Sequence, residues 1–299
     1  HADGNYNFSH LTDFAEIQVG GSYRKYSLNS FGTIYTDKDG PIDYSEYGIY
    51  TQIQKDLELS DALELKLTGS VRYDKSEFFD GFFSPRISAG LTVNRNHNIR
   101  ASVQTGFRNP TTQDLFIGLD TGAYVLVGSA PDNLERYSQP YDISAAGQLL
   151  GQPATITQSG GVAYTNSYTA ASALAAAATG NPAVLEVANP SIIKPEQVSS
   201  AEVGYRGKFK NLIVDFSTYY NKYKDFISQG RVISPFYGTV GDEGLSVAAI
   251  ANRDYQIYGS YTNAEADVKS YGASIGLSMK VFGGFDLGGS YTYSKLDFD

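Results

Sequence analysis

Apolar and polar positions alternate along several long segments of this chain. The clearest is residues 63–74, where Leu63 and Leu65 alternate with Glu64 and Lys66. Successive side chains of a β-strand point to opposite faces, so this alternation is typical of a strand with one apolar and one polar face. The same pattern predicts nine strands, in segments 16–28, 46–55, 63–74, 86–94, 99–108, 201–209, 212–223, 271–281 and 285–293. The sequence therefore predicts an all-β chain.

The connections between these segments are short and long in strict alternation. The short ones fall near 56–62, 94–98, 209–211 and 282–285, and the long ones near 28–43, 75–82, 109–197 and 229–267. In an up-and-down sheet all short turns then lie at one end, as in outer-membrane barrels with short periplasmic turns and long extracellular loops. A soluble β-sandwich also alternates, but most segments here exceed the usual five or six residues or so. We therefore expect an antiparallel transmembrane β-barrel segment with long extracellular loops.

The composition agrees with a barrel. The chain has 24 Tyr and 31 Gly, a mixture that suits strands joined by turns. Many tyrosines lie near the ends of the predicted strands, where aromatic girdles of membrane barrels sit; ordinary cross-strand packing is the alternative explanation. These tyrosines are Tyr23, Tyr26, Tyr44, Tyr47, Tyr73, Tyr219, Tyr220, Tyr223, Tyr291 and Tyr293.

Other classes of protein fit poorly. The chain has no Cys, which excludes a disulfide scaffold and thiolate chemistry, and its net charge of −9 argues against a nucleic-acid partner. No run of 18 or more apolar residues predicts a transmembrane helix. No nucleophile, Walker or dinucleotide motif is present. Asp37, Asp39 and Gly40 resemble a calcium loop, but Gly48 stands where that loop needs Glu. We expect neither catalysis nor a metal or other cofactor.

The connection at 109–197 is unusually long. Its residues 109–193 contain one basic side chain, Arg136, against six acidic ones. Within it the Ala-rich stretch from Thr169 to Thr179, followed by Gly180, predicts a short helix with a glycine stop. A connection of this length usually has a function or is disordered. It is expected to be an extracellular loop insertion that either covers the barrel mouth or also contacts substrate as a lid.

Several strings of residues resemble the TonB-dependent outer-membrane receptors, of the Bacteroidetes type. They are FFSPRIS (82–88), NIRASVQTGFRNPTTQDLFIG (98–118), IIKPEQVSSAEVGYRGKF (192–209), YYNKYKDFI (219–227), VKSYGASIGL (268–277) and GSYTYS (289–294). The resemblance implies a barrel of about 22 strands with a plugged lumen. Residues 1–299 would form a C-terminal-side portion of it, with the plug domain, the TonB-contacting segment and the remaining strands outside this chain.

The same resemblance implies a function. Such a receptor binds a substrate at its extracellular loops and imports it through the lumen with energy transmitted by TonB, in the outer membrane of a Gram-negative bacterium. The implied partners are outer-membrane lipid and TonB, with a surface lipoprotein or other subunits of an outer-membrane complex as further candidates. A structural scaffold barrel and a passive porin are the alternatives. Siderophore complexes, oligosaccharides and peptides all remain candidate substrates, although the acidic long connection disfavours strongly anionic ones.

Candidate site residues come from two places. Charged residues on the polar faces of the predicted strands would point into the lumen, where they contact substrate or plug or, as we prefer, form a static network of paired charges. These are Arg72, Arg86, Arg100, Arg108, Glu202 and Arg206. The string GFRNPTTQD leaves the barrel at its outer rim, with Asn109 and Pro110 as turn residues. It and the residues after it offer Gln113, Asp114 and Phe116 as loop contacts to a substrate.

Overall fold

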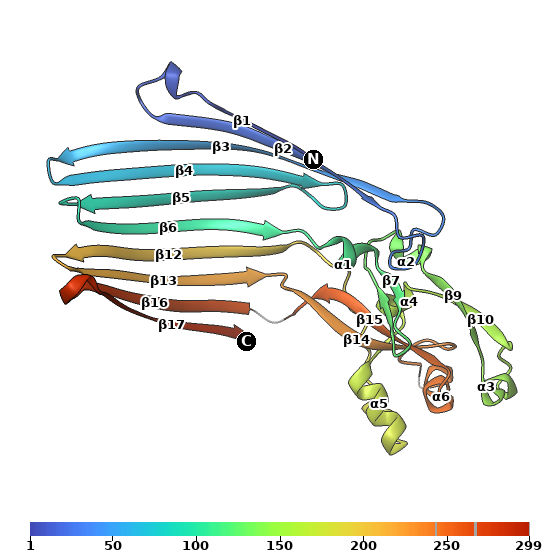
Figure 1. Cartoon of the computed structure of the whole chain (residues 1–299). Helices are drawn as coiled ribbons and strands as arrows, with labels where there is room; N and C mark the ends of the chain where they lie inside the picture. The colour runs from blue at the N-terminus through green and yellow to red at the C-terminus, as the bar shows by residue number, and fades with distance from the viewer. Residues whose placement is uncertain (243, 266–267, 299) are drawn as a thin grey trace.

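A ten-stranded antiparallel sheet, the main sheet, forms most of the molecule (Figure 1). The computed structural model describes residues 1–242, 244–265 and 268–298. The strands follow one another in chain order across the sheet, with β1 and β17 at its edges. They are β1 (Ala2–Asn7), β2 (Glu16–Leu28), β3 (Ile42–Ser60), β4 (Leu63–Ser76), β5 (Phe82–Val93), β6 (His97–Arg108), β12 (Glu196–Phe209), β13 (Leu212–Lys224), β16 (Val268–Lys280) and β17 (Asp286–Phe298).

The nine predicted strands are all present, but the prediction was incomplete. It missed β1, a six-residue strand whose sequence ADGNYN has no aliphatic side chain larger than alanine and which pairs with β2 at the edge of the sheet. It also began several strands too late, most clearly β3, which starts at Ile42, β5, which starts at Phe82, and β12, which starts at Glu196. Antiparallel pairing gives short and long connections on alternate ends, as predicted. The short end also carries the turns η1 (Ser9–Leu11) and η3 (Phe282–Gly284).

The two faces of the main sheet differ in chemistry. One face carries large apolar side chains that are widely exposed, such as Ile87 (71% exposed), Val103 (64%) and Ile49 (57%). The neighbouring residues in each strand carry the charged, hydroxyl and amide groups to the other face, as Ser102 and Gln104 do beside Val103. A soluble sheet would bury its apolar face, whereas a membrane barrel directs it to lipid and keeps the polar face inside.

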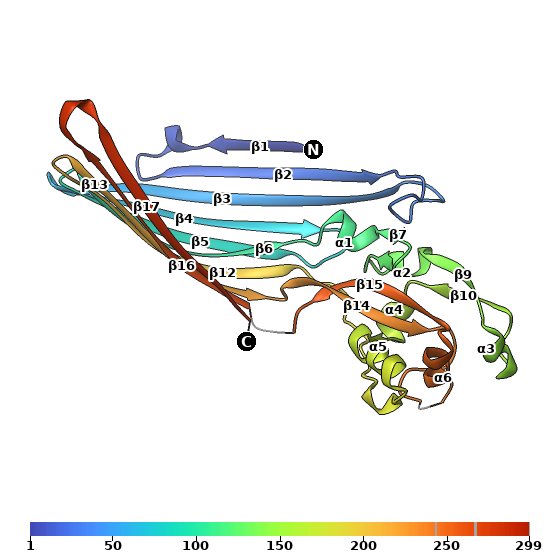
Figure 2. The same cartoon turned by 60° about the horizontal axis from the view of Figure 1, so that its bottom comes forward.

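The two longest connections fold together into one body at the long-loop end of the sheet, which we call the cap (Figure 2). It comprises the described residues of 109–195 and 226–264. The prediction treated 229–267 as a plain connection, but it contains the strands β14 (Ile227–Pro235) and β15 (Tyr255–Asn263) around the helix α6 (Leu245–Asn252). Local pairing of β14 with β15 was missed because the second half of β14 and the middle of β15 are buried on both faces and therefore do not alternate.

The first cap segment contributes short elements. They are α1 (Thr112–Phe116), β7 (Gly118–Asp120), β8 (Val125–Val127), α2 (Asn133–Arg136), β9 (Ser138–Asp142), α3 (Ala145–Leu149), β10 (Thr155–Ser159), α4 (Val162–Thr165), β11 (Tyr168–Thr169), α5 (Ala170–Thr179) and η2 (Pro182–Val184). The helix α5 occupies the Ala-rich stretch. The Thr169 side chain accepts a hydrogen bond from the Ser172 amide at its start, and Gly180 ends it with φ at 69°.

Strand pairing joins the two segments. A five-stranded sheet has the order β11-β14-β15-β8-β7, so strands of the first segment flank the β14–β15 hairpin on both sides. Apolar side chains from both segments bury together around it, with Val127, Ile233 and Tyr258 at 0% exposure. Because each segment completes the core of the other, the cap is a single packed unit.

A third connection, residues 29–41 between β2 and β3, is attached to the cap. The amide of Thr36 donates to the Phe116 carbonyl at 3.1 Å, and the Gly118 amide donates to the Ile34 carbonyl at 2.9 Å. Within this connection the buried Asp37 carboxylate accepts hydrogen bonds from the amide and hydroxyl of Ser30 and from the Gly32 amide. The connection is therefore held in one shape and extends the cap over β2 and β3.

No helix within the described ranges is long and apolar enough to cross a membrane.

Candidate ligand-binding site

A cavity lies where the polar face of the main sheet meets the cap. Its volume is about 600 Å³. The walls are the cap-side ends of β2, β3, β4 and β6 together with the first cap residues, 109–112. Ligand pockets of small molecules fall in the range of about 300–1,000 Å³ and occur where structural units meet. This cavity is the candidate ligand-binding site.

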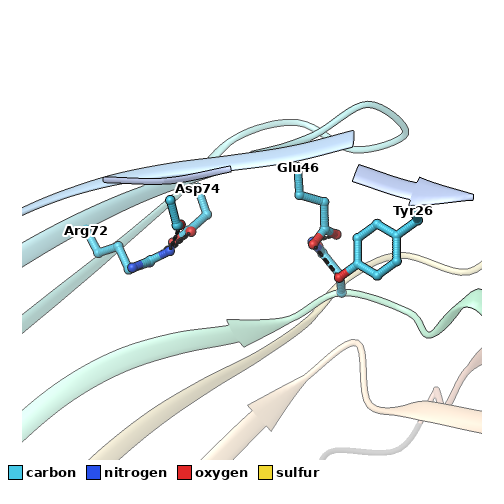
Figure 3. A network of polar contacts seen from close by, with 6 residues as sticks. Tyr26, Glu46, Arg72 and Asp74 are labelled. Atoms are coloured by element: carbon cyan, nitrogen blue, oxygen red, sulfur yellow. Dashed lines mark hydrogen bonds and ion pairs between the residues drawn. The ribbon is translucent and has the colours of Figure 1, made fainter. Parts of the chain in front are cut away.

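One wall of the cavity is a charge network around Arg72 (Figure 3). The Arg72 guanidinium donates to both carboxylate oxygens of Asp74, at 2.8 and 2.7 Å, and to the Ser22 hydroxyl at 2.9 Å. Gly48 lies beneath this pair, because a Cβ there would stand 2.2 Å from an Asp74 oxygen. The paired charges cancel, and the network holds β2 and β4 side chains in fixed positions across β3.

Glu46 is the centre of a second network, which connects the sheet to the cap. Its Oε2 accepts from the Tyr26 hydroxyl at 3.2 Å, and its Oε1 accepts from the Asn109 amide nitrogen at 2.7 Å. A carboxylate only accepts, so it fixes the Asn109 amide with its nitrogen toward Glu46. The ring of Tyr26 stacks on Tyr44, with centroids 4.5 Å apart. Carboxylates, hydroxyls, guanidinium groups and aromatic rings together suit a polar small ligand.

The predicted lumen residues divide into paired and unpaired groups. Arg108 pairs with Glu196 at 3.0 Å, and Arg100 and Arg206 both approach Asp215, at 4.0 and 3.8 Å. Arg72 is likewise paired, with Asp74, so each of these four arginines has a carboxylate partner; the static role of the network stays a prediction. The ion pairs of the described chain do not include Arg86 or Glu202, which line a second cavity of about 420 Å³ with Arg100.

The predicted loop residues have structural partners. The Gln113 amide nitrogen donates to the Tyr261 hydroxyl at 3.0 Å, and Asp114 forms a capping box with Thr111 at the start of α1. Phe116 is 0% exposed and packs 5.3 Å from Phe78 and 5.6 Å from Tyr44, measured between ring centroids. A ligand cannot reach this ring in the observed conformation, so Phe116 is a core residue that joins cap and sheet.

Sequence reasoning missed most of the first cavity, since Arg72 is its only predicted contributor among the lining residues of the described chain. Glu46 and Asp74 lie on the polar faces of predicted strands, so a search for acidic as well as basic residues there would have found them. Glu196 lies in what was predicted as loop, and no pattern in the sequence indicates its partners. Asn109 was assigned only a turn role.

Burial controls the ionisation of several cap tyrosines. Burial raises the pKa of Tyr164 and of Tyr258 far above the usual range, so both hydroxyls stay protonated. The Tyr164 hydroxyl donates a hydrogen bond shared by the carbonyls of Tyr261 and Val127, at 3.1 and 3.3 Å. Burial also raises the pKa of Tyr261, and the hydrogen bond from Gln113 offsets part of that effect. These tyrosines act as neutral hydrogen-bonding groups inside the cap.

Comparison with known proteins gives a match along the whole chain. The family model described as "TonB dependent receptor-like, beta-barrel" covers residues 1–299. The vitamin B12 transporter BtuB of Vibrio vulnificus is 33% identical over 109 residues, which are 35% of this chain and 17% of that protein. Both descriptions are of transporters and receptors rather than enzymes.

Solved structures share the fold. The siderophore receptor PirA from Pseudomonas aeruginosa matches with a TM-score of 0.59 and 14% identity, covering 98% of this chain and 39% of that one. PirA from Acinetobacter baumannii matches with a TM-score of 0.52 and 14% identity, over 98% and 35%. The FrpB iron transporter from Neisseria meningitidis gives 0.52 and 13%, over 98% and 34%. The chain thus spans well under half the length of these proteins.

Proposed function

Because this chain belongs to the TonB-dependent receptor β-barrel family, we propose that it forms part of the wall and the outer cap of a receptor that imports a small ligand. Barrels of this family are proteins of the Gram-negative outer membrane. The ligand binds in the cavity between the polar face of the main sheet and the cap, and TonB supplies the energy for its passage through the lumen.

One observation carries the proposal: a cavity of ligand size lies on the polar face of a sheet whose other face is apolar and exposed. A membrane barrel has this arrangement because lipid solvates the outer face and the lumen is polar. The cavity also opens at the end where the long connections gather. A ligand entering from that end meets the cap first and the charge networks of Glu46 and Arg72 next.

The cap is extracellular in this proposal, and the short turns are periplasmic. Single cysteines test this orientation, since the sequence has none of its own. Ala175→Cys in α5 and Asp61→Cys in the β3–β4 turn are both exposed positions. A membrane-impermeant maleimide applied to intact cells should label Ala175→Cys and label Asp61→Cys only after lysis. The reverse pattern would invert the orientation.

The names of the relatives, which refer to vitamin B12 and to siderophores, suggest two kinds of ligand to test. The test uses the full-length receptor in a Gram-negative host that lacks its own receptors for these compounds. Uptake of labelled cyanocobalamin and of ferric siderophores is measured with and without TonB, and native mass spectrometry of the purified receptor identifies any other bound ligand. Uptake that requires TonB supports the proposal.

The alternatives give different results. Uptake that persists without TonB would indicate a passive porin. A receptor that holds no small ligand but co-purifies with other outer-membrane proteins, a surface lipoprotein among them, would indicate a scaffold barrel. We favour the importer because polar groups of the sheet and of the cap root meet in the wall of this cavity, which a scaffold does not need.

Mutations in the cavity should then change affinity. Glu46→Gln removes the negative charge and leaves one acceptor oxygen where there were two, so the amide can accept from Asn109 or from Tyr26 but not from both. We expect the ligand dissociation constant to rise by about tenfold, as for loss of one hydrogen bond to a charged group. Glu64→Gln, at an exposed position of β4 near the short turns, is the matched control. Equal affinity of wild type and Glu46→Gln would remove Glu46 from the site.

A further inference from the structure

The junction between cap and main sheet contains a carboxylate that holds both cap segments. Glu196, the first residue of β12, is 8% exposed. Its Oε2 accepts a hydrogen bond from the Arg108 guanidinium at 3.0 Å and another from the main-chain amide of Ile227 at 3.0 Å. Arg108 ends β6 where the chain enters the first cap segment, and Ile227 begins the second.

From this geometry we propose that Glu196 is a positioning residue that clamps the cap over the ligand cavity. It does not line that cavity, and its carboxylate acts by fixing the roots of the two segments relative to each other and to β12. The inference rests on the proposed function only for the ligand; the clamp itself concerns the position of the cap relative to the main sheet.

The clamp reaches the cavity through one peptide unit. Arg108 binds Glu196, and the next residue, Asn109, binds Glu46 in the cavity wall at 2.7 Å. Two consecutive residues at the cap root are therefore tied to two different strands, β12 and β3. A rotation of the cap root that breaks one tie must strain the other. Ligand contacts at Glu46 would thus be sensitive to an interaction on the far side of β6.

A second tie at the same junction uses an amide. Asn263, the last residue of β15, donates to the carbonyls of Lys194 and Asp225, at 2.9 and 2.6 Å, and accepts from the Lys194 amide at 2.7 Å. It joins the return of the first segment to both ends of the second. Three of the four crossings of these segments between cap and sheet are therefore fastened together, and Glu196 also fastens them to the fourth, at the end of β6.

The packing makes such a clamp effective. The cap is one unit, because its two segments complete each other's cores. A packed unit of this kind moves as a whole about its attachment points rather than segment by segment. Releasing its roots should therefore change the position of the entire cap, including the cavity wall formed by residues 109–112.

Three variants separate the two bonds of Glu196. Glu196→Ala removes both. Arg108→Ala removes only the ion pair, and Glu196→Gln keeps one neutral carbonyl oxygen, which can still accept from the Ile227 amide. Glu196→Ala should therefore have the largest effect, and the other two should have similar, smaller effects. Asp215→Asn is the control, because it removes another carboxylate paired with arginines on the same polar face, away from the roots.

The experiment measures cap position in the full-length receptor. Spin labels are placed at Ala175→Cys in α5 and at Ala201→Cys on the apolar face of β12, both exposed. Pulsed electron resonance then gives the distance distribution between cap and sheet. We expect one narrow population in the wild type and in Asp215→Asn, and a second population in Glu196→Ala. Hydrogen exchange at the Ile227 amide should accelerate by about tenfold or more in Glu196→Ala and by less in the other two variants.

Heat-modifiable electrophoretic mobility confirms in each case that the barrel is folded. If Glu196→Ala does not fold, the comparison of Glu196→Gln and Arg108→Ala with wild type carries the test. A distance distribution unchanged in these variants would overturn the clamp, as would an equal change in Asp215→Asn. The measurement needs neither ligand nor TonB, so the clamp can fail while uptake persists, and uptake can fail while the clamp stands.

Discussion

The main sheet and the cap differ in which of their chemical groups are withdrawn from solvent. In the cap, apolar side chains such as Phe116, Val127 and Ile233 are withdrawn from solvent, as in a soluble domain. In the main sheet the apolar side chains are the exposed ones, and the backbone of each inner strand is satisfied by hydrogen bonds to its two neighbours. One chain thus contains two regions built for two solvents, lipid and water.

Each region is therefore sensitive to a different kind of substitution. The cap depends on the fit of side chains in its cores, so removal of atoms there should cost the most. The main sheet depends on which face each side chain occupies, so a charge on the wrong face should cost the most. A substitution that destabilises one region in this way should leave the stability of the other region unchanged.

The largest expected effect is in the cap core. Phe116→Ala removes a ring that joins Tyr44 of the sheet to Phe78 and to the cap, and it should destabilise the cap by about 3–5 kcal/mol. Limited proteolysis of the folded receptor would then cut the cap while the barrel stays heat-modifiable. Phe282→Ala, at a ring that is 87% exposed in the short-turn end, should change nothing. Equal protease resistance of Phe116→Ala and wild type would contradict the core role.

The next effect is in the main sheet. Ile275→Arg places a charge on the apolar face near the middle of β16 and should destabilise the inserted barrel by about 2–4 kcal/mol. Ser274→Arg, one residue earlier on the polar face, should have a much smaller effect. Urea unfolding in lipid vesicles measures both. If Ser274→Arg proved the more harmful, the assignment of the two faces would be reversed.

A pH effect is expected in the connection 29–41 of the cap region. Burial alone would raise the pKa of Asp37, but hydrogen bonds from Ser30 and Gly32 outweigh it, and the pKa is lowered. The unfolded connection therefore binds a proton at higher pH than the folded one. Its stabilisation is present above the usual carboxyl range and is lost as the pH falls through the lowered folded pKa. Hydrogen exchange at the Ser30 and Gly32 amides, corrected for intrinsic rate, should rise there in the wild type, and Asp37→Asn should lack this dependence.

The smallest expected effect concerns one helix end. Thr169→Ala removes the side chain that accepts from the Ser172 amide at the start of α5, and should cost about 1 kcal/mol locally. Thr179→Ala at the other end should be neutral or stabilising, because alanine has the higher helix propensity. Hydrogen exchange of the first amides of α5 distinguishes the two. Faster exchange in Thr179→Ala than in Thr169→Ala would show that the Thr169 hydrogen bond does not limit the stability of the first turn of α5.

Much of the main sheet could be predicted from the sequence. A strand between lipid and a polar lumen alternates along its whole length, so nine of the ten strands of the main sheet, and the alternation of short and long connections, are visible in the residues. The exception, β1, is short and has no aliphatic side chain larger than alanine, and it is held by its pairing with β2 and by a hydrogen bond from Gln18 to Asn5. The helix α5 was also predictable, because alanines followed by Gly180 are a local signal.

The cap and the cavity could not be predicted in the same way. Parts of β14 and β15 are buried on both faces, so they lack a period of two there, and their partners β11 and β8 lie far away in sequence. Glu46 of β3 meets Asn109, just after the end of β6. Glu196 meets Arg108, at the other end of the first cap segment, and Ile227, at the start of β14.

The sequence by itself thus determined which residues face lipid and which face the lumen, because that choice is repeated at every second position and needs no knowledge of neighbours. Only the tertiary structure decided that two separate connections form one cap, and that Glu46 and Glu196 hold its roots. Those contacts depend on the docking of distant segments, and a pattern along the chain carries no record of it.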